Sequence, residues 1–426
     1  MINVCVFPAQ NESAVEINNA LSNCESINVF GIALIRGHNE FNFRNYYFGF
    51  PKITDEDFAQ IFEQFILEHH IDVVFPTTDS TVVYFAQNKN RFTARIVNAD
   101  YDSAVICNDK RKTYALFQSY DFCPIVYTPD HVEYPCFIKP ADGEGAVGAR
   151  IVKQKEDMPE TEIANDVILE YLPGEEMTVD CISDKDGRLV EVLPRKREKV
   201  FSGMSVFGST VKASEEILSM AQVINDKLKF RGLWYFQVKK SSSGLFKLLE
   251  ISMRCAGTMC QTRARGYNLP LLSVYTALGK EISAVENDYS VVIDRTLFAR
   301  YKTDISYNIV YIDYDGTIIV KGKVCLSVMR FLYQCKNENK RIVLISRHNE
   351  DHDNTLEADM KQHGISIDLF DEIVSLTFSE EKYSAITEKD AIFIDNSFFE
   401  RNKVITACGI PVFGVENLDA LQDWRL

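Results

Sequence analysis

The chain has 426 residues, of which 46% are hydrophobic and 25% are charged, a composition typical of a globular protein with two or three domains. The formal net charge of −15 argues against unspecific binding to nucleic acid, which depends on a basic surface. The 11 cysteines are odd in number and form no CxxC pair, so we expect reduced thiols and a cytoplasmic protein. No apolar run reaches the roughly 18 residues of a membrane-spanning helix, so no membrane contact is expected.

The first 105 residues alternate short apolar runs with amphipathic stretches. The clearest helix is predicted over residues 54–69, with Thr54 as its cap and apolar side chains recurring at helical spacing. This alternation predicts a parallel sheet flanked by helices. The turn after the first strand has no GxGxxG pattern, so we expect no dinucleotide site there. The predicted strands are residues 2–7, 27–34, 71–75 and 94–98.

A glycine-rich loop follows an apolar strand in Cys136–Arg150, which reads CFIKPADGEGAVGAR. The strand delivers Lys139 to a loop that contains Gly143, Gly145 and Gly148. Glycines let backbone N–H groups approach phosphate oxygens, and the lysine adds a positive charge close by. Ordinary turns between strands show the same pattern, so the loop alone leaves both interpretations open.

Two later strands point to a divalent cation beside phosphates. One strand carries Gln237, and the next carries Glu250 with Arg254 just beyond it. Mg²⁺ prefers hard oxygen ligands and usually shares them with substrate phosphates. Four features in this order along the chain resemble the ATP-grasp superfamily. They are the lysine, the glycine loop, a strand that breaks at Pro173–Gly174, and the paired oxygen ligands. The resemblance is to its carbamoyl-phosphate-synthase-like carboxylate ligases and covers about residues 1–290.

The resemblance implies a pre-ATP-grasp domain at residues 1–105 and an ATP-grasp domain at residues 106–290, whose two lobes meet near residue 170. It implies ATP and Mg²⁺ as cofactors, with Gln237 and Glu250 as metal ligands. The residues that it implies for nucleotide binding are Lys110, Lys139, Glu144, Gly145, Gly148, Glu170, Tyr171, Leu172 and Glu176.

Plainer interpretations of the same segments remain open. Lys110 falls in the first turn of a helix that Asn108 or Asp109 can cap, and a lone lysine there is usually solvated. The segment EYLPGEEMTVD, Glu170–Asp180, taken by itself favours a hairpin whose acids face solvent. In the metal segment the family pattern is Glu-Ile-Asn-x-Arg, whereas this chain has Ser252 in place of asparagine. A hydroxyl replaces a carbonyl there, so the second metal site is expected to be weaker or rearranged.

A basic cluster at Leu193–Val211 interrupts an acidic chain. Arginine grips carboxylate or phosphate with two hydrogen bonds, which favours an anionic substrate, although such a cluster is also typical of a solvated face. The loop PTTDSTV resembles the family's substrate-facing loop, and a helix cap at Asp79 explains it equally well. By the resemblance Arg254 is also catalytic. The implied substrate-binding residues are Arg195, Arg197, Ser205 and Arg254.

A fresh α/β pattern begins at Tyr307, after a predicted linker at residues 291–306. Asp313 and Asp315 end a strand two residues apart, which puts them on the same face. Together with Ser346, Lys382 and Asp395, each near a predicted strand end or in a loop, they resemble the haloacid-dehalogenase-like phosphatases. The segment 307–426 is therefore expected to be a capless, Rossmann-like domain of that family.

That second resemblance implies roles for these residues. Asp313 is the nucleophile, Asp315 the general acid and base, Ser346 the phosphate-binding hydroxyl and Lys382 the neutralising cation. Mg²⁺ would be held by Asp313, Asp315 and Asp395. Asn396 and Phe399 stand where many relatives have a second acid, so Glu400 compensates or the domain is degenerate. His348 and His352 are predicted to lie on the surface.

These expectations combine into a bifunctional enzyme. The first part would join a small-molecule carboxylate to an amine through an acyl-phosphate, and the second would hydrolyse a phosphomonoester of the same pathway. The substrates are expected to be phosphorylated or sugar-linked, and a homodimer is possible. Two alternatives are a kinase or carbamoyl-phosphate-type enzyme, and a nucleotide-binding scaffold with a degenerate phosphatase domain.

Overall fold

The computed structural model describes residues 1–37, 39–143, 147–159, 165–284, 287, 289–296, 298–351 and 354–425, without the side chains of residues 350 and 351. The chain divides into two compact units, Met1–Leu297 and Phe298–Trp424, called here the first and the second unit. Both contain strands and helices, so the predicted mixed α/β architecture with several domains is confirmed. Within the described residues, no helix is both long and apolar enough to cross a membrane.

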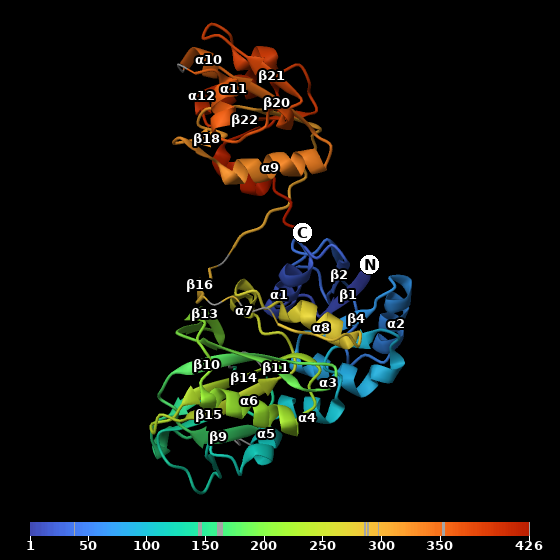
Figure 1. Ribbon diagram of the computed structural model, residues 1–426, viewed down its shortest axis with the longest axis vertical. Coiled ribbons are helices and arrows are strands. Elements are labelled where there is room, and N and C mark those ends of the chain that lie inside the picture. Colours follow the sequence, from blue (N-terminus) through green and yellow to red (C-terminus); the bar gives the residue numbers. More distant parts are fainter. Residues whose placement is uncertain are drawn as a thin grey trace. The chain divides into compact units, whose positions relative to one another are not determined.

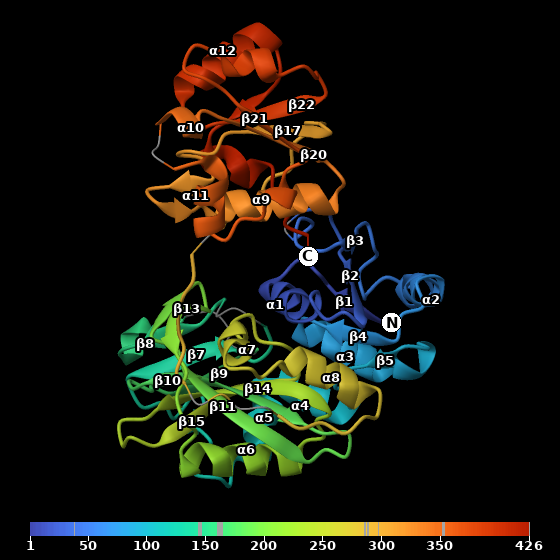
Figure 2. The same cartoon turned by 45° about the horizontal axis from the view of Figure 1, so that its top comes forward.

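A parallel sheet opens the first unit (Figure 1), with the strand order β3-β2-β1-β4-β5, and Figure 2 labels all five strands. Alternate residues of β1 pack on opposite faces, Val4 and Val6 against α1, and Cys5 and Phe7 against α2. The predicted parallel sheet is confirmed. Its elements are β1 (Ile2–Phe7), α1 (Glu12–Leu21), β2 (Ile27–Ile32), β3 (Asn45–Tyr47), α2 (Phe58–Glu68), β4 (Val73–Pro76), α3 (Asp79–Asn88), η1 (Lys89–Arg91) and β5 (Arg95–Ile96).

The cap predicted at Thr54 is wrong. Helix α2 begins at Phe58, and its N-cap residue is Asp57. The preceding residues form a separate turn, in which the Asp55 carboxylate accepts a hydrogen bond from the backbone N–H of Lys52 over 2.8 Å. A turn held by its own side chain competes with the helix, because aspartate bonds readily to nearby backbone groups.

Two antiparallel sheets follow in the first unit, with the orders β6-β9-β7-β8 and β11-β10-β14-β15. Because β9 and β10 belong to different sheets, the segment between them is a connection and not a hairpin. The elements are α4 (Tyr101–Asn108), α5 (Lys110–Phe117), β6 (Val126–Tyr127), β7 (Cys136–Pro140), β8 (Arg150–Val152), η2 (Lys155–Asp157), β9 (Asp166–Glu170), β10 (Glu176–Ser183), β11 (Leu189–Lys196), α6 (Glu215–Lys227), β14 (Gly232–Lys240) and β15 (Phe246–Ser252).

The first unit ends later than expected. A small sheet has the order β12-β13-β16, and its last strand lies inside the predicted linker at residues 291–306. The linker prediction is therefore wrong for these residues, because their backbone pairs with β13. The remaining elements are β12 (Lys199–Phe201), β13 (Met204–Ser209), α7 (Cys260–Ala264), α8 (Leu269–Ala277) and β16 (Val292–Asp294).

The second unit is a parallel sheet in the order β21-β20-β17-β22-β23. Figure 2 shows α9 and α11 on one side of this sheet and α12 on the other, in agreement with its two apolar clusters. The elements are β17 (Ile309–Ile312), β18 (Ile319–Val320), β19 (Lys323–Val324), α9 (Leu326–Asn337), β20 (Arg341–Ser346), α10 (His348–Asp351), α11 (Leu356–Gln362), η3 (Ile367–Leu369), β21 (Glu372–Ser375), η4 (Lys382–Ala385), β22 (Ala391–Ile394), α12 (Phe398–Cys408), β23 (Val412–Phe413) and η5 (Val415–Ala420).

Candidate active sites

The sheet β11-β10-β14-β15 has one apolar and one polar face. Alternate residues such as Val179, Trp234 and Phe236 pack against α6. The residues between them face the other way, and the strand register sets Gln237 opposite Glu250. This polar face forms one wall of the site in the first unit.

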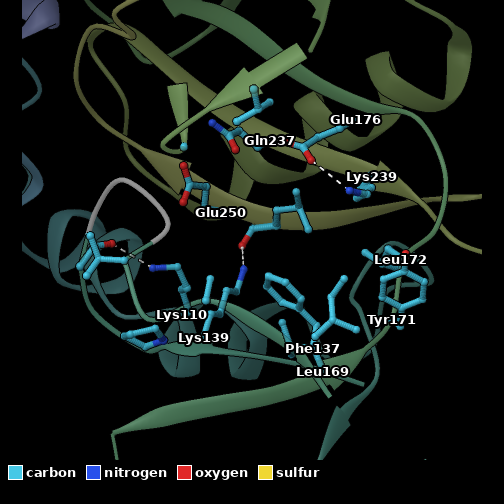
Figure 3. A pocket seen from close by; sticks show the side chains of 18 of the residues that line it. Lys110, Phe137, Lys139, Leu169, Tyr171, Leu172, Glu176, Gln237, Lys239 and Glu250 are labelled. Atoms are coloured by element: carbon cyan, nitrogen blue, oxygen red, sulfur yellow. Dashed lines mark hydrogen bonds and ion pairs between the residues drawn. The ribbon is translucent and has the colours of Figure 1, made fainter. Parts of the chain in front are cut away.

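A cavity of about 320 Å³ lies between this face and the sheet that carries β7 and β9 (Figure 3). It combines apolar walls with converging charged side chains, which is typical of a site for a small organic ligand. Its charged or amide-bearing lining residues are Lys110, Lys139, Asp142, Glu170, Glu176, Arg197, Gln237, Lys239 and Glu250. Its apolar lining residues include Phe137, Val147, Ile151, Leu169, Leu172, Val200 and Leu249.

Two lysines converge at one end of the cavity. The Lys139 ammonium donates to the Leu249 carbonyl over 2.8 Å, and the Lys110 ammonium donates to the Gly143 carbonyl over 3.3 Å (Figure 3). Asp109 is the N-cap residue of α5, so the prediction that Lys110 lies in the first turn of a helix is confirmed. Two buried cations beside a glycine loop suit a polyphosphate.

Burial is the main reason why the pKa of Lys139 falls from 10.5 to about 7. The positive charge of Lys110 lowers this pKa further, and the carboxylates of Glu250 and Glu176 only partly offset the loss. Lys139 is therefore largely neutral above pH 7 until an anion enters the cavity. Glu144 and Gly145 lie outside the described residues. Gly148 has φ +78°, which favours glycine, and an added Cβ would meet Pro140 at 3.1 Å.

The opposite end of the cavity is formed by the connection between the two sheets. Tyr171 and Leu172 follow the last residue of β9, so their backbone groups lie beyond the strand ladder and beside apolar walls. The Glu170 carboxylate accepts from the backbone N–H of Ile125 over 2.9 Å, and this bond fixes the end of the strand. Glu176 is held by Arg197 at 2.7 Å and Lys239 at 3.2 Å. This end of the cavity therefore suits a ligand with a planar ring that has polar groups at its edge and a substituent that carries hydroxyl groups.

Gln237 and Glu250 project into the cavity from neighbouring strands (Figure 3). Among the described residues, no group of three or more His, Cys, Asp or Glu side chains could hold a metal ion. One carboxylate and one amide are too few for a cage made by protein alone. They fit Mg²⁺, which usually takes few protein ligands and completes its shell with substrate phosphates and water.

The substrate roles predicted for Arg195 and Ser205 require correction. Arg195 is 1% exposed, and its guanidinium forms two hydrogen bonds with the Asp180 carboxylate, at 2.8 and 3.1 Å, and a further one with Thr258. Ser205 is equally buried. Neither residue lines the cavity, whereas Arg197 does. Arg195 is therefore assigned to holding β10 and β11 against the segment before α7.

We expect Arg195→Met to lower the free energy of unfolding of the first unit by about 3–5 kcal/mol, because it leaves the Asp180 carboxylate buried without its cation. The measurement is urea unfolding followed by the fluorescence of Trp234, in a chain whose Trp424 is replaced by phenylalanine. Lys196→Met is the control, since Lys196 is 38% exposed and its ion pair with Glu175 is worth less than about 1 kcal/mol. Equal losses in both variants would contradict this role for Arg195.

Sequence reasoning missed Lys239 in this site. It follows Gln237 by two residues on β14, and strand periodicity places both on the same face. Arg254 lies beyond β15, where its guanidinium contacts the Asp79 carboxylate at 3.2 Å and lies over the Tyr235 ring. Asp79 is not the cap of α3, because Thr78 takes that position. The carboxylate of Asp79 instead contacts Ser252 and Arg254, which lie far from it in the sequence.

The second unit gathers its predicted residues at the ends of adjacent strands. The Lys382 ammonium lies between Asp313 at 2.5 Å and Asp395 at 2.7 Å. Thr317, which sequence reasoning missed, donates to the other Asp313 oxygen over 2.9 Å. Burial, followed by the charge of Asp395, raises the pKa of Asp313 against the opposing effect of Lys382. The two carboxylates outweigh burial and raise the pKa of Lys382, so this residue stays charged.

His348 is not on the surface as predicted. It is 3% exposed, and its Nδ1 lies 2.9 Å from the Asp315 carboxylate, while its backbone N–H donates to the Ser346 hydroxyl. The prediction failed because β17 and β20 are neighbours, which brings residues 33 positions apart into contact. His352 lies outside the described residues.

The residues after Asp395 do not supply a second carboxylate. Asn396 contacts Thr317, and an added Cβ on Gly316, which has φ +80°, would meet the Asn396 amide at 2.3 Å. Glu400 pairs with Arg347 at 3.5 Å and Lys403 at 3.7 Å, so its carboxylate is engaged elsewhere. The predicted compensation by Glu400 is therefore not supported by these contacts.

Residues 162–296 match the family model described as ATP-grasp in the biosynthetic pathway with Ter operon. The search of curated proteins gave no match. One similar solved structure is the biotin carboxylase domain of 2-oxoglutarate carboxylase from Hydrogenobacter thermophilus, with a TM-score of 0.55 at 13% identity. That structure is a dimer in complex with MgADP, ADP and bicarbonate. That similarity covers 68% of this chain and 73% of the other.

Two further solved structures are similar to the same extent. The L-amino acid ligase from Bacillus licheniformis has a TM-score of 0.53 at 15% identity, over 65% of this chain and 74% of its own. N5-carboxyaminoimidazole ribonucleotide synthetase from Thermotoga maritima has a TM-score of 0.52 at 13% identity, over 68% of this chain and 80% of its own. The family match shows an ATP-grasp segment at residues 162–296, and the solved structures share the fold of about two thirds of this chain. The family model ends at residue 296, before the second unit begins.

Proposed function

We propose that the first unit, with its ATP-grasp domain, is an ATP- and Mg²⁺-dependent ligase that joins a small-molecule carboxylate to an amine. The observation that carries this proposal is a single cavity with two buried lysines at one end and Gln237 with Glu250 beside them. The carboxylate would take the terminal phosphate of ATP, and the amine would then displace phosphate from the acyl-phosphate, giving an amide, ADP and phosphate. The structurally similar proteins include an L-amino acid ligase and a ribonucleotide synthetase, whose names fit this chemistry.

Each group of residues has a separate task in this proposal, and all of them except Gly148 and Arg254 line the cavity. Lys110 and Lys139 bind the phosphates, with Gly148 in the loop that approaches them. Glu170, Tyr171 and Leu172 form the adenine site, and Glu176 accepts from the ribose hydroxyls. Gln237 and Glu250 hold Mg²⁺, which neutralises phosphate charge. Arg197 and Arg254 bind substrate, and Arg254 also stabilises the charge that develops during transfer.

We expect ADP release by the purified protein to require an acid and an amine together. The measurement is ADP and product analysis with Mg²⁺-ATP and panels of carboxylates and amines, supplied singly and in combination. An amide as product supports the ligase. ADP with one acceptor alone and a stable phosphate ester would instead establish a kinase. A protein that binds ATP without any turnover, and whose ATP affinity is unchanged in Glu250→Gln, would favour a nucleotide-binding scaffold.

We expect the protein to take up close to one proton when a nucleotide binds at pH 8, and almost none when it binds at pH 6. In the free protein the pKa of Lys139 is lowered to about 7, and the phosphates restore its charge, so the complex binds the extra proton. By the same linkage, ADP affinity falls as the pH rises above 7. Titration calorimetry in two buffers of different ionisation enthalpy measures the proton directly. Uptake that persists in Lys139→Met would contradict this assignment.

For the second unit we propose a phosphomonoester hydrolase of the haloacid-dehalogenase type, acting on a substrate or product of the ligase. The contact of Lys382 with both Asp313 and Asp395, at the ends of adjacent parallel strands, supports it. Asp313 would attack phosphorus and release the alcohol, which takes a proton from Asp315, and water would then hydrolyse the aspartyl-phosphate. Ser346 would bind the phosphate.

Mg²⁺ is expected from the sequence on Asp313, Asp315 and Asp395, but these acids form no three-residue metal group among the described residues and Asp315 pairs with His348. Asp313 and Asp395 would therefore hold Mg²⁺, with phosphate and water completing its shell.

A further inference from the structure

A carboxylate from the first sheet reaches the metal segment of the ATP-grasp domain. The Ser252 hydroxyl donates to one Asp79 oxygen over 2.5 Å, and the Arg254 guanidinium contacts the same oxygen at 3.2 Å and the other at 3.4 Å. Asp79 is the first residue of α3, directly after β4 and the Thr78 cap. The side chains of Asp79 and Arg254 are 21% and 13% exposed, so a small ligand can still reach them.

Asp79 also lies on the same side of β15 as Glu250. Glu250 and Ser252 are two residues apart on this strand, so their side chains share a face about 7 Å apart along it. Tyr235 is the partner of Ser252 in the strand register, and the Arg254 guanidinium lies over its ring.

The Asp79 carboxylate offers an oxygen donor beside Ser252, where this chain lacks the asparagine of the ATP-grasp pattern. Ser252 stands where the ATP-grasp pattern has asparagine, whose amide oxygen lies one covalent bond farther from the backbone than a hydroxyl, on the order of 1 Å. A carboxylate oxygen hydrogen-bonded to the Ser252 hydroxyl lies in the region that the amide oxygen would otherwise approach. It also offers a charged oxygen, which Mg²⁺ prefers to a hydroxyl.

We propose that Asp79 replaces the missing asparagine as an oxygen ligand of the second Mg²⁺, shared with Glu250. Ser252 and Arg254 hold the carboxylate in place, as hydrogen-bonding partners of metal ligands commonly do. This inference rests on the proposed function of the first unit. It makes the metal site depend on the N-terminal sheet as well as on the ATP-grasp domain.

The test is Mn²⁺ binding in the presence of ADP, counted by electron paramagnetic resonance of the free ion. The wild type is expected to bind two Mn²⁺ ions, and Asp79→Asn to keep one and bind the other at least about tenfold more weakly. Asp72→Asn, which removes a carboxylate at the opposite end of β4, is expected to match the wild type. Asp79→Ser combined with Ser252→Asn is expected to recover the second ion that Asp79→Ser loses.

Two results would overturn the inference while leaving the ligase intact. They are two unchanged Mn²⁺ ions in Asp79→Asn with a raised KM for the acid or amine, and a single ion in the wild type. The first assigns Asp79 to substrate, and the second removes the second site. A weaker second ion in Arg254→Gln is expected, because Arg254 holds the carboxylate in place. Absence of both ADP and Mn²⁺ binding in the wild type would reject the proposed function itself.

Discussion

Lys139→Met is expected to lower the rate of ADP release by about 10²–10³-fold, the usual cost of removing one preorganised donor to developing charge. Lys139 lies at the phosphate end of the cavity, where its ammonium contacts the Leu249 carbonyl and lies over the Tyr114 ring. Methionine has a similar length and no charge. The folded protein is not expected to lose stability, because burial of the ammonium is itself unfavourable, as its lowered pKa indicates.

The measurement is the initial rate of ADP formation with a saturating acid and amine, together with thermal unfolding to confirm the fold. Lys153→Met is the matched control, because Lys153 is exposed and does not line the cavity. It is expected to retain the wild-type rate. A Lys139→Met enzyme that turns over at the wild-type rate would show that the phosphates bind elsewhere.

Asp313→Asn is expected to reduce phosphomonoester hydrolysis by at least about 10³-fold, because an amide cannot replace the attacking carboxylate. The rate of ADP formation by the first unit is expected to stay the same. Asparagine keeps the volume of aspartate and its hydrogen bond to Thr317, and Lys382 keeps its contact with Asp395. Phosphate release from a panel of phosphomonoesters with Mg²⁺, in the absence of ATP, measures this activity.

Asp368→Asn is the control for that experiment, since Asp368 is exposed in the same unit and belongs to η3, away from these strand ends. It is expected to leave hydrolysis unchanged. If the wild type itself released no phosphate from any ester, the second unit would be the degenerate domain that Asn396 and Phe399 suggest, and the pairing of two activities would fail.

Local patterns predicted much of the fold and part of the site. Alternating apolar runs predicted the parallel N-terminal sheet, and the separation of Gln237 from Glu250 by one turn predicted a pair on neighbouring strands. The cap at Asp109 likewise depended on residues next to it in the chain. Such features are set by interactions over a few residues, which a single sequence displays directly.

Predictions that needed long-range pairing were less accurate. Arg195 and Arg197 are close in sequence, yet Asp180 on the adjacent strand binds Arg195, and only Arg197 reaches the cavity. The contact between His348 and Asp315 likewise depends on which strands are neighbours. A buried polar side chain requires a partner, but the sequence does not state which one it finds.

The most direct test of the ligase follows oxygen from the carboxylate substrate. With an acid labelled by oxygen-18 in its carboxylate, formation of an acyl-phosphate transfers one labelled oxygen to the inorganic phosphate that is released. We therefore predict that mass spectrometry of the phosphate finds one oxygen-18 for each amide formed, and that Lys139→Met forms labelled phosphate about 10²–10³-fold more slowly. Unlabelled phosphate accompanying the amide, or label retained in a stable phosphate ester, would contradict the proposed reaction.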